Sequence, residues 1–255
     1  MEALISVRDA ALTYQAEEGE VQALEQVSFS IQPGEFVSLV GPSGCGKSSL
    51  LSAIAGLEKL TGGEITVCGK KVTAPDERIG LMPQRDQLFE WQDIRRNVML
   101  GLRIRGLWDG PHKERVEKLL ERYGLSEFAD KRPSRLSGGM RQRCALIRTL
   151  AVDPQILLLD EPFSALDYQT RLQVSCDILR IIRAEGKTAL LVTHDISEAL
   201  SLSDRVVVLS RRPARVKTIV DMGGLQKLSP MQRRERPEFT EFFDTIWKEL
   251  DLHDG

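Results

Sequence analysis

The chain contains the octapeptide Gly41-Pro42-Ser43-Gly44-Cys45-Gly46-Lys47-Ser48, which matches the pattern G-x-x-x-x-G-K-[ST] at every fixed position. The apolar run at residues 36–40 predicts a buried strand before it, and residues 49–55 predict a helix after it. Glycines let a backbone curve around an anion without Cβ clashes, and the N–H groups of such a loop and of the following helix face phosphates. The octapeptide therefore predicts a phosphate-binding loop in an α/β protein.

The residues of this loop are expected to bind a nucleotide and its metal ion. Lys47 can reach the β- and γ-phosphates and is a predicted catalytic residue, and the Ser48 hydroxyl can ligate Mg²⁺. The residues predicted to contact the nucleotide are Gly41, Pro42, Ser43, Gly44, Cys45, Gly46, Lys47, Ser48 and Ser49. Cys45 lies at the N-terminus of the predicted helix, where the pKa of a thiol tends to fall. We therefore expect alkylation of Cys45 to block turnover.

Length and composition narrow the class of protein. The 255 residues suffice for one large domain or two small ones, and a hydrophobic content of 42% supports a buried core. A net charge of −2 gives no argument for a nucleic-acid partner. No apolar run approaches the ~18 residues of a membrane span. The cysteines are scattered without a C-x-x-C pair, so we expect a reducing compartment rather than disulfides or a zinc site.

Apolar periodicity divides the chain into regions. The strands and the hairpin predicted in the N-terminal part lie at residues 4–7, 11–14, 21–31, 62–72 and 79–82. Residues 93–151 show helical spacing instead, with Gly124 as a helix stop and Ser137 as an N-cap. Strands and helices then alternate at residues 156–159, 168–183, 188–192, 196–202 and 205–209. Such alternation indicates a parallel sheet with crossover helices.

Two helices predicted in the second half of the chain are expected to be amphipathic. Residues 237–250 predict a short amphipathic helix rich in aromatic residues. On the helix predicted at residues 168–183, the expected apolar stripe consists of Leu172, Ser175, Cys176, Leu179 and Ile182.

Two carboxylates follow the aliphatic run at residues 156–159, at the end of a strand where ligands bind in open α/β sheets. Asp160 is expected to hold Mg²⁺ through water, and Glu161 to orient and deprotonate the attacking water. The alternative is that Glu161 is a solvated loop carboxylate. Asn97 is the only asparagine, so the guanine-selective N-K-x-D pattern is absent and ATP is favoured over GTP.

A second candidate phosphate site is the heptapeptide Leu136-Ser137-Gly138-Gly139-Met140-Arg141-Gln142. A serine and two glycines at the start of a predicted helix suit an anion. The alternative is an ordinary capped helix that begins after a turn. Because one γ-phosphate has little need for two cradles in one chain, a binding role here implies that the heptapeptide serves the nucleotide of another subunit.

These three motifs, in this order and at these separations, resemble those of the nucleotide-binding subunits of ATP-binding cassette (ABC) transporters. The heptapeptide resembles the signature of that family, and the similarity covers about residues 4–220. The resemblance implies a P-loop NTPase (RecA-like) α/β core with an N-terminal antiparallel β subdomain and an inserted α-helical subdomain. Within one domain at residues 1–255, the implied divisions are the core with its β subdomain at 1–85 and 152–220, the helical subdomain at 86–151 and a helical tail at 221–255.

Further residues match other motifs of that family. Tyr14 resembles the aromatic residue that stacks on adenine, with an ordinary strand tyrosine as the alternative. Gln84 resembles the glutamine that contacts Mg²⁺ and the attacking water, although Pro83 precedes it where an aromatic residue is usual. Asp167 ends a Ser-Ala-Leu-Asp motif that resembles the D-loop at the dimer interface. His194, within Thr-His-Asp, resembles the histidine that contacts the γ-phosphate.

The resemblance implies a composite catalytic site with ATP and Mg²⁺ as cofactors. One subunit would hold ATP through Lys47, Ser48, Gln84, Asp160 and His194, with Glu161 as the base. A second copy or a paralogous ATPase subunit would close over the γ-phosphate with Ser137, Gly138, Gly139 and Gln142. ATP binding would close the dimer and hydrolysis would open it. The implied partners are integral membrane permease subunits, contacted by the helical insertion and the region after Gln84, and indirectly an extracytoplasmic solute-binding protein. The implied location is peripheral, on the cytoplasmic face of the inner membrane.

Longer runs at residues 34–48, 161–167 and 210–216, with the closing helix that ends at Ile246-Trp247, resemble importers of the nitrate, sulfonate and taurine group. Three alternatives stay open: an exporter subunit, a soluble ABC ATPase acting on ribosomes or DNA, and a module that binds ATP without turnover. The basic cluster Arg211, Arg212, Arg215 and Lys217 is interpreted as a solvated turn, with contact to anionic lipid as the alternative.

Overall fold

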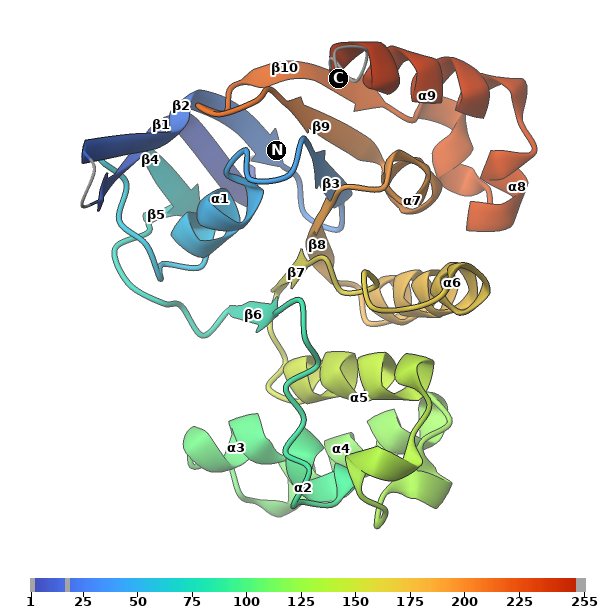
Figure 1. The fold of residues 1–255 in the computed structure, drawn as a ribbon. Helices are drawn as coiled ribbons and strands as arrows, with labels where there is room; N and C mark the ends of the chain where they lie inside the picture. Colours follow the sequence, from blue (N-terminus) through green and yellow to red (C-terminus); the bar gives the residue numbers. More distant parts are fainter. Residues whose placement is uncertain (1–2, 17–18, 251–255) are drawn as a thin grey trace.

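Two β-sheets form the framework of the chain, whose computed structural model describes residues 3–16 and 19–250 (Figure 1). The antiparallel sheet has the order β2-β1-β4-β5, and the larger sheet has the order β10-β9-β3-β8-β7-β6. The strands of the first sheet are β1 (Ile5–Ala16), β2 (Gly19–Ile31), β4 (Gly62–Val67) and β5 (Lys70–Lys71). The strands of the second sheet are β3 (Phe36–Val40), β6 (Ile79–Met82), β7 (Ile156–Asp160), β8 (Thr188–Thr193), β9 (Arg205–Leu209) and β10 (Val216–Asp221).

Helices cover the larger sheet and form the lower part of the molecule in Figure 1. The α-helices of the described residues are α1 (Lys47–Ile54), α2 (Ile94–Val98), α3 (Leu100–Ile104), α4 (Gly110–Arg122), α5 (Gly138–Leu150), α6 (Tyr168–Ala184), α7 (Ile196–Leu202), α8 (Pro230–Arg234) and α9 (Pro237–Glu249). The short 3-10 helices are η1 (Ser126–Phe128), η2 (Pro133–Arg135) and η3 (Gly223–Lys227).

The larger sheet separates two apolar cores. Along β7, Ile156 and Leu158 pack toward the antiparallel sheet and α1, whereas Leu157 and Leu159 pack toward α5 and α6. This alternation follows from the two-residue period of a strand. Because both faces of the sheet are covered, β7 and β8 consist almost entirely of apolar residues, as buried parallel strands do.

The register of the parallel strands aligns three chain segments at one edge of the sheet. Val40 of β3 pairs with Thr193 of β8, and Asp160 of β7 pairs with Val192 of β8. The phosphate-binding loop follows β3, Glu161 follows β7 and His194 follows β8. Because parallel strands end at the same edge, these three segments lie beside one another, although they are far apart in the chain.

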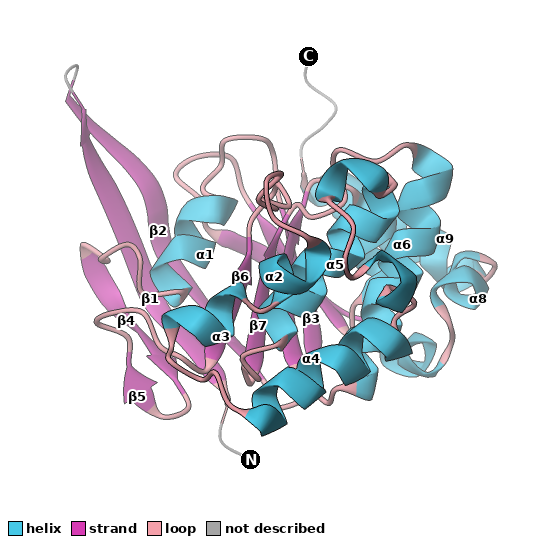
Figure 2. Ribbon diagram, turned by 90° about the horizontal axis from the view of Figure 1, so that it is seen from below, coloured by secondary structure: helices cyan, strands magenta, loops and turns pink. Residues whose placement is uncertain are grey.

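Helices α2–α5 gather beyond β6 and β7, away from the antiparallel sheet (Figures 1 and 2). Strand β6 leads into this region, and α5 returns the chain toward β7. The two elements approach closely, since a Cβ built on Gly80 of β6 would lie 2.6 Å from Cγ2 of Thr149 in α5. Among the helices of residues 3–16 and 19–250, none is both long and apolar enough to cross a bilayer.

The predicted fold class is confirmed, with corrections to single elements. The runs at residues 4–7 and 11–14 form one strand, β1, because a bulge around Asp9 (φ +46°) shifts the register between Val7 and Ala10 without ending the pairing. Strand β10 and helix α8 were missed: β10 is an edge strand with mixed exposure, and α8 has only five residues. The division into subdomains at residues 1–85, 86–151, 152–220 and 221–255 stays a prediction.

The apolar stripe predicted for α6 was partly wrong. Val174, Ile178 and Ile181 are buried, whereas Leu172 and Cys176 are only half-buried. The cause is the packing of α5 on this side of α6, where a Cβ built on Gly139 would lie 2.5 Å from Cγ2 of Val174. A periodicity taken from one helix alone cannot reveal such a neighbour.

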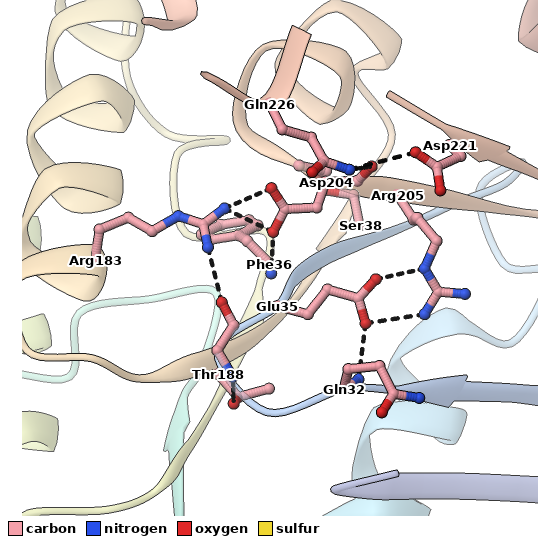
Figure 3. Close-up of polar contacts among 12 residues, drawn as sticks. Gln32, Glu35, Phe36, Ser38, Arg183, Thr188, Asp204, Arg205, Asp221 and Gln226 are labelled. Atoms are coloured by element: carbon pink, nitrogen blue, oxygen red, sulfur yellow. Dashed lines mark hydrogen bonds and ion pairs between the residues drawn. The ribbon is translucent and has the colours of Figure 1, made fainter. Parts of the chain in front are cut away.

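A polar network ties the sheet to α6 and to the C-terminal segment (Figure 3). The carboxylate of Asp204 accepts two hydrogen bonds of 2.6 Å from the Arg183 guanidinium and one of 2.8 Å from the Phe36 N–H. The side-chain amide of Gln226 in η3 donates to the Asp204 carbonyl at 3.2 Å and to Asp221 Oδ1 at 3.3 Å. The segment after β10 is therefore anchored to the central strands through polar contacts.

Arg233 of α8 extends this anchoring into the interior. Its side chain is among the most buried of the described residues, at 1% exposure, and its guanidinium donates only to backbone carbonyls. The acceptors are the carbonyls of Ser203 (2.6 Å), Gln226 (3.0 Å), Leu228 (3.2 Å) and Leu200 (3.4 Å). Since Leu200 lies in the last turn of α7 and Ser203 is its C-cap, the cation also meets the negative end of that helix dipole.

We predict that Arg233→Met lowers the free energy of unfolding by about 3 kcal/mol, because several buried carbonyls lose their donor together. The measurement is urea unfolding followed by circular dichroism. Arg236→Met, at an exposed position of the same segment, is the matched control and should change stability by less than about 0.5 kcal/mol. Equal stabilities of the two variants would contradict the assigned role.

Candidate nucleotide-binding site

The phosphate-binding loop has a backbone that requires glycine at Gly46. This residue has φ +122°, and a Cβ built on it would lie 2.8 Å from the carbonyl oxygen of Ala23. Gly46 is also the N-cap of α1 and leaves the first N–H groups of that helix without a side-chain acceptor. The loop therefore presents unpaired N–H donors at a positive helix end, which is the arrangement that binds phosphate.

Lys47 holds its positive charge at this loop. Its Nζ donates to the carbonyls of Gly41 at 2.8 Å and Pro42 at 2.9 Å. An ammonium group has three N–H donors, so one remains for an anion bound at the loop.

At the end of β7, Asp160 faces the loop from the other side. Ser48 Oγ donates to Asp160 Oδ1 at 3.0 Å. Burial raises the pKa of Asp160 above its ordinary value, and the Ser48 hydrogen bond opposes this shift. A cation beside the carboxylate would favour its charged form. One hydroxyl with one carboxylate fits Mg²⁺, which commonly takes its other ligands from water and phosphate.

Glu161 is the centre of the polar contacts at this edge. Its carboxylate Oε2 lies 3.3 Å from Nε2 of Gln84 and 3.3 Å from Nδ1 of His194. Ser164 Oγ donates to the Glu161 carbonyl at 3.0 Å. Glu161 also has φ +43°, a strained conformation for a residue with a Cβ, and such strain clusters at functional sites. The predicted set Gln84, Glu161 and His194 is thus brought together.

A hollow of about 250 Å³ lies beside the phosphate-binding loop and reaches Glu161, whereas Gln84, Asp160 and His194 are not among its lining residues. The predicted residues that line it are Tyr14, Ser43, Gly44, Gly46, Lys47, Ser48, Ser49 and Glu161. Three lining residues were missed from the sequence: Val21, Ala23 and Arg212. Val21 lies opposite Tyr14 in the β1–β2 register, which apolar periodicity alone does not reveal. Arg212 belongs to the basic cluster that was interpreted as a solvated turn.

The heptapeptide at residues 136–142 lies apart from this hollow. Helix α5, which it opens, is separated from α1 by β6 and β7 in Figure 1, and none of its residues is among those lining the hollow. Ser137 caps α5 by accepting from the Met140 N–H at 3.4 Å, and Gly138 is exposed. Gln142 is only 4% exposed, so its side chain is not on the surface. A role of this segment in nucleotide binding stays a prediction.

Asp167 is exposed at the start of α6, where its side chain accepts from the Thr170 N–H at 3.1 Å. Hydrogen bonding from the Thr170 side chain, and then from this N–H, lowers the pKa of Asp167. In the first turn of α6, Arg171 contacts both the segment before this helix and the residue after His194. Its guanidinium donates to the Leu166 carbonyl at 2.9 Å, and its Nη1 lies 3.6 Å from Asp195 Oδ2. The segment predicted to face a second subunit is therefore linked to the residue that follows His194.

The predicted fall in the pKa of the Cys45 thiol was wrong, and the effect of its alkylation on turnover stays a prediction. Its side chain is 2% exposed, and a Cβ built on Gly41 would lie 2.9 Å from its Sγ. Burial raises the pKa of the thiol, and the nearby Lys47 charge only partly opposes this shift. The position of Cys45 at a helix N-terminus therefore does not lower the pKa of its thiol, because burial raises it more. The sequence alone does not reveal that burial.

Fold and site together define a P-loop nucleoside triphosphatase of the cassette type. The family model described as ABC transporter matches residues 24–164. The chain belongs to the ABC transporter family, as an ATP-binding ATPase subunit.

Similar proteins agree with this assignment. The chain is 43% identical over 240 residues to the uncharacterized ABC transporter ATP-binding protein YtlC of Bacillus subtilis, covering 94% of this chain and 92% of that protein. It is 38% identical over 253 residues to the taurine import ATP-binding protein TauB of Roseobacter denitrificans, covering 95% and 94% of the two chains. A solved dimeric structure of the ATP-binding cassette MJ0796, bound to ADP and phosphate, superposes with a TM-score of 0.73 at 33% identity, covering 86% of this chain and 99% of that one.

We predict that maleimide at pH 7 modifies the half-buried Cys68 and Cys176 of the native protein well before Cys45, because the Cys45 side chain is buried and out of reach of the reagent. Peptide mass spectrometry over time measures each site, and unfolded protein, which should react at all cysteines, is the control. Rapid labelling of Cys45 in the native protein would contradict the burial argument.

Proposed function

We propose that the chain hydrolyses ATP to power solute import through a separate membrane permease. The observation that carries the hydrolytic part is the contact of Glu161 with Gln84 and His194 at the edge that also holds the phosphate-binding loop. The importer part is supported by the similarity to proteins named as taurine import subunits. None of the described residues indicates which solute would be imported.

In the proposed mechanism, ATP lies along the hollow with its phosphates on the loop. Lys47 uses its remaining N–H on the β- and γ-phosphates, and Mg²⁺, held through Ser48, Asp160 and Gln84, would offset negative charge on them. Glu161 accepts a proton from the attacking water, which Gln84 orients. His194 reaches the γ-phosphate from β8 and stabilises the charge that develops on it.

A second subunit completes the site in this proposal. Ser137 and the two glycines after it present the N-terminus of α5, and none of the three is among the residues that line the hollow of the same chain. Placed over the γ-phosphate of a second copy or a paralogous subunit, this helix end would bind the phosphate while Asp167 lies at the interface. Support comes from the dimeric structures of the similar cassette MJ0796. ATP then closes the dimer, and hydrolysis opens it.

The permease is proposed to dock near the segment that follows Gln84. Trp91 is 70% exposed and stacks on Phe89, with ring centroids 4.8 Å apart. Arg141 of α5 donates to both carboxylate oxygens of Asp86, at 2.8 and 3.1 Å. A movement at Trp91 would therefore reach both Gln84 and the helix that begins at the heptapeptide.

The remaining partners follow from the importer proposal. The subunit would sit peripherally on the cytoplasmic face of the inner membrane, and an extracytoplasmic binding protein would deliver solute to the permease. An exporter subunit is the second candidate, because both directions use the same ATPase, and only the relatives' names favour import. No described residue favours a role on ribosomes or DNA.

We predict that Glu161→Gln lowers kcat for ATP hydrolysis by about 10²–10⁴-fold, because the amide cannot accept the proton of the attacking water. ATP affinity should be retained, and size-exclusion chromatography with ATP should show a stabilised dimer. Glu58→Gln, at an exposed position after α1, is the control and should keep full turnover. Near-normal kcat of Glu161→Gln would remove Glu161 from the role of base.

We predict that Trp91→Ala weakens binding to the permease by about 2 kcal/mol, as loss of an exposed aromatic anchor does. The measurement is recovery of a polytopic membrane protein with the tagged subunit from solubilised native membranes. Trp247→Ala, an exposed tryptophan of α9 far from α2 in Figure 1, is the matched control. Equal recovery with both variants would contradict docking at Trp91.

A further inference from the structure

The loop between β9 and β10, at residues 210–215, reaches the same hollow as the phosphate-binding loop. Arg212 of this loop lines the hollow together with Tyr14, Gly46 and Lys47. We propose that Arg212 binds the nucleoside end of ATP, through the base or the ribose. This inference rests on the proposed function and adds a recognition residue that lies outside the motifs described above.

The backbone holds this loop in place beside the phosphate-binding loop. Ala214 donates to the carbonyl of Ala23 at 2.9 Å, and Glu25 donates back to the carbonyl of Ala214 at 2.9 Å. The Ala23 carbonyl is also the group that a Cβ on Gly46 would strike. The backbone next to Arg212 is therefore hydrogen-bonded to Ala23, and Ala23 packs against Gly46 at the start of α1.

The interior of the loop is also organised. The single O–H of Ser210 is within hydrogen-bond distance of the carbonyls of Arg211 (2.9 Å) and Pro213 (3.2 Å), and Ser210 Oγ accepts from the Arg215 N–H at 2.9 Å. The Arg215 guanidinium lies 2.5 Å from Glu25 Oε1 of β2. The backbone on both sides of Arg212 is thus positioned before any ligand binds.

The order of strands indicates which end of the nucleotide Arg212 would meet. In the sequence β10-β9-β3-β8-β7-β6, the loop after β9 lies on one side of β3, and the carboxylates after β7 lie on the other. Ser48 and Asp160 mark the metal and γ-phosphate end by their 3.0 Å hydrogen bond. We therefore assign Tyr14 and Arg212, which also line the hollow, to its opposite end, where the nucleoside would lie.

The charge of Arg212 is available for a ligand. Its side chain is exposed, and over residues 3–16 and 19–250 it forms no hydrogen bond or ion pair, whereas its neighbour Arg215 is paired with Glu25. A guanidinium is planar, carries five N–H donors and stacks on π-systems. It can therefore lie against a base or donate to ribose oxygens.

The test compares Arg212→Gln with Arg211→Gln, a neighbouring arginine that does not line the hollow. Calorimetry measures the affinity of each full-length chain for MgADP, which avoids turnover, and for inorganic tripolyphosphate, which has no nucleoside. Arg212→Gln should bind MgADP about tenfold more weakly, as expected for loss of a charged hydrogen bond, and tripolyphosphate unchanged. The MgADP affinity of Arg212→Lys should lie between those of the wild type and Arg212→Gln. The affinity of Arg211→Gln should match that of the wild type.

Steady-state kinetics give a second readout. An interaction made equally in the ground state and transition state changes KM and not kcat, so Arg212→Gln should raise KM for ATP about tenfold at unchanged kcat. Unchanged MgADP affinity would overturn the inference, and so would an equal loss for MgADP and tripolyphosphate, which is the signature of a general charge effect. A wild-type chain that binds neither ligand would overturn the proposed function and this inference together.

Discussion

The parallel pairing of β3, β8 and β7 is the constraint on which the candidate site depends. Val40 opposite Thr193, and Asp160 opposite Val192, bring the ends of three strands to one edge. The pairing is held by apolar side chains on both faces of the sheet, so a shift of register would turn those side chains to the wrong core. The polar groups at the edge are thus positioned by the hydrophobic packing of the strands before them.

Several charged side chains lie close together and partly buried at this edge of the sheet. The ammonium of Lys47 donates to two loop carbonyls and keeps one N–H for a ligand, and Asp160, its pKa raised by burial, keeps a hydrogen bond from Ser48. Glu161 stands in a strained backbone conformation between Gln84 and His194. A bound nucleotide and metal would supply the missing opposite charges, which explains how groups that are unfavourable alone can form a stable site.

Helix α7 connects this edge to the C-terminal segment. Its N-cap is Asp195, which follows His194 and accepts from the Glu198 N–H at 3.0 Å. Arg233 holds the other end through carbonyls of α7 and the residue after it. Because α7 has only seven residues, both of its ends must be fixed for the histidine to keep its place beside Glu161. The segment after β10 therefore supports the site without lining it.

The sequence by itself determined the fold class, the strand–loop–helix around Lys47 and the pairing of an aliphatic strand with Asp160 and Glu161, because these are local patterns with local physical causes. Only the tertiary structure decided the burial that raises the pKa of Cys45, the face that α6 buries under α5, and the approach of Arg212 to the hollow. Each of these depends on neighbours distant in the chain. Desolvation and contact are properties of packed surfaces, which a local pattern does not contain.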